Sequence, residues 1–169
     1  MAWPFKLPTL SRPTVGLVLA VVILAAVAPK LCAADETYVV VVSPDVAYSD
    51  IGIDELRRIY QFKQRFWRAG QPLNLLYSEE DLTPGSFLLD RIYRKDYGDV
   101  KKLILQSLYS GEIDLAPKVV ATDETAVAFV ASGRGLIAVV RADAVGDEPV
   151  KVLTVGGRAP DAADYPLRR

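Results

Sequence analysis

The sequence predicts an α/β fold: a single small domain with a mainly parallel or mixed sheet flanked by helices. Two observations carry this prediction. Short runs rich in β-branched residues alternate along the chain with segments whose apolar residues recur at helical spacing. Strands that alternate with helices are typical of α/β domains. A length of 169 residues favours one domain once an N-terminal apolar segment is set aside.

The predicted strands are the apolar runs 38–42, 72–77, 119–121, 136–140 and 150–155. The first is a tyrosine and four valines ended by Ser43-Pro44, which is typical of a buried central strand. Residues 45–52 are predicted to form a loop. The tail 156–169 has Gly, Pro and Asp but no periodicity, so we expect it to be loose and flexible.

The predicted helices are 53–60, a segment that begins at Thr83-Pro84 and runs through Tyr93, 99–109, and a segment that Thr122 caps. Residues 53–60 place their apolar side chains on one face. Thr83 followed by Pro84 has the pattern of an N-cap followed by Pro at the first helical position.

Residues 1–34 have the pattern of a signal peptide. Lys6 and Arg12 precede an apolar run from Val15 to Val27, which is short for a membrane span. The small residues Cys32-Ala33-Ala34 predict cleavage before Asp35 and export to the periplasm. Two alternatives stay open. The segment could remain as an uncleaved anchor, or Cys32 could be lipidated, although Leu31 stands where a lipobox has a small residue.

Composition excludes several function classes. The chain holds 20 basic and 21 acidic side chains, and the first 34 residues contain no acidic one, so the remainder is mildly acidic. This balance argues against a nucleic-acid partner and against electrostatic docking on a membrane. The absence of His and the single Cys, at position 32, argue against an enzyme, a metal centre or a cofactor that depends on these residues.

Four blocks in order resemble the phosphate-binding proteins of bacterial ABC transporters, which are type II solute-binding proteins. They are residues 53–63, Trp67 with 70–73, residues 83–87, and 122–140. The resemblance covers about 38–155 and implies a periplasmic-binding-protein-like domain over 35–155. Members of the family close two lobes on their ligand, whereas this chain has the length of one lobe. The resemblance implies phosphate or another small oxyanion as the ligand.

The family's phosphate loop aligns with 79–86, which places Glu79 where the family has Arg. The candidate ligand-binding residues are Ser78, Thr83, Gly85, Ser86 and Thr122. Free N–H groups at a helix start, together with hydroxyls, hold oxyanions readily. Simple helix capping is the alternative explanation for Thr83 and for Thr122.

Two functions follow as hypotheses. The first is an exported, non-catalytic solute-binding domain that takes part in ABC-type phosphate uptake. The second is a single-lobe protein-interaction module that has lost ligand binding and uses its cleft face to bind another protein or itself.

Overall fold

The structure is a computed structural model, and it describes residues 36–114 and 116–169. The described residues belong to one compact unit, which spans 35–169. The predicted signal peptide, its cleavage site and Cys32 lie outside the described residues. Among the residues that are described, no helix is both long and apolar enough to cross a membrane.

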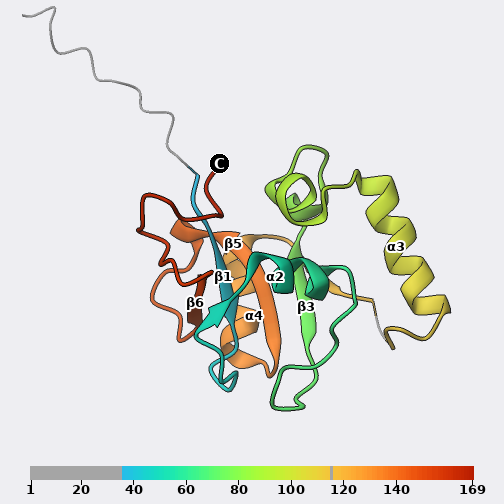
Figure 1. The fold of residues 1–169 in the computed structure, drawn as a ribbon, viewed down its shortest axis with the longest axis horizontal. Coiled ribbons are helices and arrows are strands. Elements are labelled where there is room, and N and C mark those ends of the chain that lie inside the picture. The colour runs from blue at the N-terminus through green and yellow to red at the C-terminus, as the bar shows by residue number, and fades with distance from the viewer. Residues whose placement is uncertain (1–35, 115) are drawn as a thin grey trace, which may run out of the picture. The chain divides into compact units, whose positions relative to one another are not determined.

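Six strands form one mixed sheet in the order β2-β6-β1-β5-β3-β4 (Figure 1). Their bounds are β1 Tyr38–Val42, β2 Asp50–Ile51, β3 Asn74–Ser78, β4 Lys118–Val120, β5 Leu136–Arg141 and β6 Lys151–Val155. β1 runs antiparallel to both β5 and β6, whereas β3 is parallel to β5 and β4, and β2 is parallel to β6. The predicted α/β class with a mixed sheet is confirmed.

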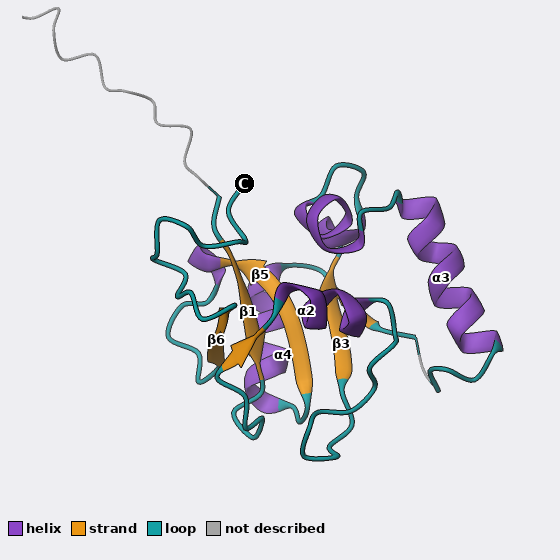
Figure 2. Ribbon diagram, in the orientation of Figure 1, coloured by secondary structure: helices purple, strands orange, loops and turns teal. Residues whose placement is uncertain are grey.

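Helices cover both faces of this sheet, and Figure 2 shows α4 on the opposite side from α2. The helical segments are α2 Ile53–Tyr60, the π-type helix η2 Leu88–Tyr93, α3 Tyr97–Tyr109 and α4 Asp123–Ser132, with short 3-10 turns η1 Glu80–Leu82 and η3 Ala142–Ala144. α3 exposes Leu105 and Tyr109 to solvent.

β1 lies in the middle of the sheet, and both of its faces are buried. Val40 and Val42 belong to the core cluster that includes the apolar face of α2 and most of η2. Val39 and Val41 point the other way, into a second cluster with Ala126, Val127 and Val130 of α4. The alternation along the strand therefore divides the valines between two cores, which explains why the run reads as continuously apolar.

The predicted helix start at Thr83-Pro84 is wrong. The chain first makes the 3-10 turn η1, and the Thr83 hydroxyl donates to the carbonyl oxygen of Glu80 at 2.7 Å. The helix begins at Phe87–Leu88 instead, where the Ser86 Oγ accepts a hydrogen bond from the Leu89 N–H at 3.3 Å. Gly85, with φ of +79°, turns the chain between the two segments. The hydroxyl that serves η2 is therefore Ser86.

The prediction of a loose tail over 156–169 is also wrong. Tyr165 and Leu167 are buried in the larger core cluster. Leu167 accepts a backbone hydrogen bond from Tyr38 at 2.9 Å, and Arg168 forms an antiparallel bridge with Thr37. Two buried apolar side chains and backbone pairing hold this segment, although its sequence has no periodicity. The predicted loop 45–52 likewise contains the short strand β2.

Candidate functional site

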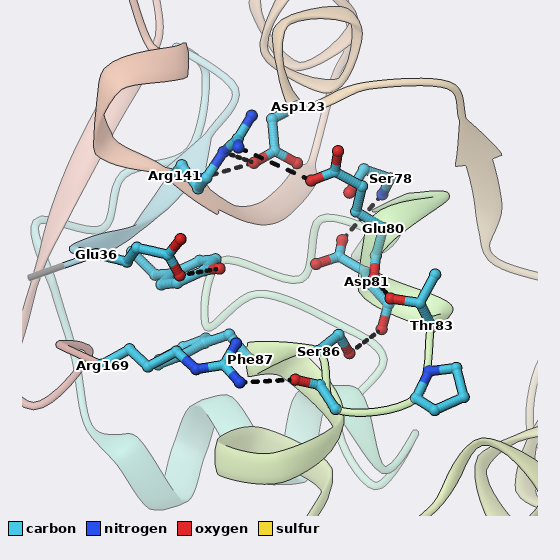
Figure 3. Close-up of a pocket in the computed structure, with 13 residues that line it drawn as sticks. Glu36, Ser78, Glu80, Asp81, Thr83, Ser86, Phe87, Asp123, Arg141 and Arg169 are labelled. Atoms are coloured by element: carbon cyan, nitrogen blue, oxygen red, sulfur yellow. Dashed lines mark hydrogen bonds and ion pairs between the residues drawn. The ribbon is translucent and has the colours of Figure 1, made fainter. Parts of the chain in front are cut away.

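A cavity of about 240 Å³ opens at the end of the sheet where β3 stops (Figure 3). One wall is the segment from Ser78 through η1 to Phe87. The start of α4 contributes Asp123, and the end of β5 contributes Arg141. The remaining wall comes from the two ends of the domain, namely Glu36, Tyr38 and Arg169.

The structure brings four of the five predicted site residues together in this cavity. Ser78, Thr83, Gly85 and Ser86 all line it. Thr122 does not line it. Its hydroxyl caps α4 by accepting a hydrogen bond from the Thr125 N–H at 3.3 Å. The capping explanation therefore accounts for the observed contacts of Thr122, while the neighbouring Asp123 reaches the cavity.

The hydroxyl groups of this wall differ in whether they have a hydrogen-bond partner. Thr83 Oγ1 donates to a backbone carbonyl, as described above, and Ser86 Oγ donates to the carbonyl oxygen of Asp81 at 2.6 Å. Ser78 is 1% exposed, and its Oγ has no hydrogen-bond partner. A buried hydroxyl that lacks a partner carries a free-energy penalty of about 1–3 kcal/mol. Of the three hydroxyls, Ser78 is the one available to a ligand without breaking a bond.

Asp81 is the buried carboxylate of the cavity, with 7% of its surface exposed. Its Oδ2 accepts a hydrogen bond from the Ser78 N–H at 2.9 Å. Burial, with a smaller contribution from the charge of Asp123, raises the pKa of Asp81 to about 7, against the opposing effect of the hydrogen bond from Ser78. Near neutral pH this group can therefore either donate or accept a proton in a hydrogen bond with a ligand.

Arg141 lies above the cavity in Figure 3, among acidic side chains. Its guanidinium is 3.5 Å from Asp123, 3.9 Å from Glu80 and 3.9 Å from Asp143. The backbone N–H of Arg141 also donates to Asp123 Oδ2 at 2.9 Å. The Nε is within ion-pair distance of Asp123 but makes no hydrogen bond.

Arg169 lies below the cavity in the same view. Its Nη2 donates to the carbonyl oxygen of Gly85 at 3.0 Å. Beside it, the ring of Tyr38 stacks on Phe87 with centroids 4.0 Å apart, and the Tyr38 hydroxyl donates to Glu36 at 3.4 Å. This wall joins residues that are far apart in the sequence.

Sequence reasoning missed Glu36, Tyr38, Arg141 and Arg169 as lining residues. Arg141 could have been found, because it directly follows a predicted central strand. Arg169 lay in the expected loose tail and carried no signal. Glu79, which aligns with the family's anion-binding arginine, is exposed and does not line the cavity. Its backbone N–H donates to Val120 at 2.9 Å.

Within residues 36–114 and 116–169, no group of three or more His, Cys, Asp or Glu side chains is placed to hold a metal ion. The four carboxylates of the cavity, from Glu36, Glu80, Asp81 and Asp123, are instead interspersed with two guanidinium groups. This mixture of donors and acceptors suits a small polar ligand.

No family model and no curated protein matches the sequence. Among solved structures, PstS from Borrelia burgdorferi aligns with a TM-score of 0.61 at 13% identity, over 79% of this chain and 55% of that chain. An ABC-type phosphate transport receptor from Vibrio cholerae aligns with a TM-score of 0.54 at 17% identity, over 79% of this chain and 54% of that one. The chain thus spans about half the length of these structures. Its fold is that of one lobe of PstS-like binding proteins.

Proposed function

We propose that this chain is a non-catalytic binding protein for a small oxyanion, with phosphate as the ligand. The observation that carries the proposal is the cavity, in which the unpartnered Ser78 hydroxyl faces the same space as Arg141, Arg169 and the buried Asp81. A volume of about 240 Å³ lies below the range of about 300–1,000 Å³ typical of pockets for drug-sized ligands. The size therefore favours an ion over a larger molecule.

The charges of the cavity favour phosphate over sulfate. Phosphate carries a proton near neutral pH, so it donates a hydrogen bond as well as accepting several. Sulfate is fully ionised and only accepts, so an ionised Asp81 would repel it without forming a bond. Arg141 and Ser78 supply donors in the same cavity. The names of the structural neighbours from Borrelia burgdorferi and Vibrio cholerae support the same ligand.

We further propose that the domain works after export, in ABC-type phosphate uptake. The signal-peptide pattern of residues 1–34 supports export to the periplasm. The intact mass of protein recovered from the periplasmic fraction tests this. We expect the mass of a chain that begins at Asp35. A chain that keeps residues 1–34, or one that carries a lipid on Cys32, would contradict cleavage before Asp35.

Titration calorimetry of the purified protein with inorganic phosphate, sulfate and acetate tests the ligand. We expect phosphate to bind, and sulfate and acetate to bind at least tenfold more weakly. Ser78→Ala removes a buried hydroxyl donor and is expected to weaken phosphate binding about tenfold, since a hydrogen bond to a charged group contributes about 1.5–3 kcal/mol. The backbone N–H of residue 78, which Asp81 accepts, stays in place.

Ser132→Ala is the matched control. Ser132 is exposed at the end of α4, outside the cavity, and its hydroxyl donates only to carbonyl oxygens of its own helix. This variant is expected to bind phosphate like the unaltered protein. Absence of binding at millimolar phosphate would overturn the oxyanion proposal.

A further inference from the structure

The last residues of the domain are fixed against its first strand. Leu167 accepts from the Tyr38 N–H at 2.9 Å, and the backbone N–H of Arg169 donates to the carbonyl oxygen of Glu36 at 2.9 Å. Buried Leu167 anchors the segment in the core. The backbone of Arg169 is therefore held beside β1, and its side chain extends across to Gly85 on the opposite wall of the cavity.

The two guanidinium groups of the cavity differ in how far their charge is already balanced. Arg141 lies within 4.0 Å of three carboxylates, those of Glu80, Asp123 and Asp143. For Arg169, no ion pair occurs within the described part of the chain, and one of its five N–H donors goes to a neutral carbonyl oxygen. Arg169 is therefore the cation whose charge remains available to an anion.

A second observation points to a ligand in the same space. The Ser78 Oγ is buried, lines the cavity and has no hydrogen-bond partner. An anion that accepts from this hydroxyl would satisfy it, and it would also place negative charge inside a cavity that already contains Asp81 and Asp123. Such an anion requires a positive charge that these carboxylates have not already neutralised, and Arg169 supplies one.

We infer that Arg169 is the principal anion-binding cation of this cavity, delivered by the C-terminal segment in place of the arginine that the resembling family carries in its phosphate loop. The inference rests on the proposed oxyanion function and adds the residue that supplies the positive charge for binding. Glu79, the residue at the aligned loop position, is exposed and does not line the cavity, so it is not the source of positive charge there. The positive charge has a different origin in the chain.

The segments that carry Glu36, Tyr38 and Arg169 also complete one wall of the cavity. In the family that this chain resembles, two lobes close on the ligand. In the described residues the cavity has walls on both sides, because residues 36–38 pair with 167–169 and the Arg169 side chain contacts Gly85 in the loop at 83–86. The lobe described here therefore supplies a cation to the cavity from its own residues.

The test is calorimetric titration of inorganic phosphate into the purified protein and its Arg169 variants. Arg169→Gln keeps a donor for the Gly85 carbonyl but removes the charge, and we expect it to weaken phosphate binding tenfold or more. Arg169→Lys keeps the charge and is expected to lose less affinity. The affinity of the unaltered protein should also fall more steeply with added salt than that of Arg169→Gln.

Arg158→Gln is the matched control, because Arg158 pairs with Asp164 at 2.6 Å and does not line the cavity. It should bind phosphate like the unaltered protein. If Arg169→Gln binds phosphate as tightly as the unaltered protein does, the inference about Arg169 is overturned while the proposed function stands. If the unaltered protein binds no phosphate, the proposed function itself fails, and the inference fails with it.

Discussion

Replacement of Leu167 by Ala is expected to lower the free energy of unfolding by about 2–5 kcal/mol, the range for large-to-small changes in a packed core. Leu167 is 0% exposed and belongs to the larger core cluster. The change removes apolar contacts and leaves a cavity that the surrounding core residues cannot fill without moving. Urea denaturation of the variant and of the unaltered protein measures the difference.

Leu105→Ala is the matched control for this measurement. Leu105 lies on α3 with 43% of its surface exposed, so the same chemical change is expected to cost about 0.5 kcal/mol or less. A Leu167→Ala protein as stable as Leu105→Ala would mean that the segment 156–169 does not contribute to the core in solution. In that case the sequence-based expectation of a loose tail would be right after all.

The regular elements were predictable because their signals are local. The valine run of β1 and the apolar face of α2 lie within single segments, and α2 begins and ends where the pattern predicts. The tail was not predictable, because two residues, Tyr165 and Leu167, hold it through contacts with distant parts of the chain. Two large apolar residues in such a segment have no periodicity, so local reasoning cannot detect their burial.

The predicted start of the helix that contains η2 was wrong for a related reason. Thr83-Pro84 satisfies every local rule for a helix start, but the 3-10 turn η1 uses the Thr83 hydroxyl as its own C-terminal contact. The cap then passes to Ser86, after the turn at Gly85. Thr83, Gly85 and Ser86 still line the cavity, because the loop as a whole faces it whichever residue caps the helix.

Four residues of one wall of the cavity could be predicted, whereas the opposite wall could not. These residues all lie within 78–86, so the resemblance of this loop to a phosphate loop was enough to identify them. They are Ser78, Thr83, Gly85 and Ser86. The opposite wall depends on the register between β1 and the C-terminal segment, which sets where Arg169 falls. Register between distant segments is a tertiary property, and one sequence without a periodic pattern does not reveal it.

Asp81→Asn is expected to make the protein more stable at pH 8. The pKa of Asp81 is about 7 in the folded protein, chiefly because of burial, against 3.8 for the free side chain. Above pH 7 the carboxyl is ionised in both states, and its burial then costs the folded state about 4 kcal/mol, at about 1.4 kcal/mol per pKa unit. Asn keeps an oxygen that accepts from the Ser78 N–H and carries no charge, so the variant avoids this cost.

The pH dependence distinguishes this cause from a change in packing. As the pH falls from 7 toward 4, folded Asp81 is protonated while the unfolded side chain is still ionised, so the cost in the unaltered protein disappears. The advantage of Asp81→Asn should therefore shrink steadily between pH 8 and pH 5 in urea denaturation. Asp54→Asn, at an exposed ion pair with Arg57, should change the stability by about 0.5 kcal/mol or less at either pH. An Asp81→Asn protein that is less stable than the unaltered one at pH 8 would mean that the folded protein stabilises the ionised carboxylate. The positive charge near Asp81 would then have to exceed what Arg141 and Arg169 supply.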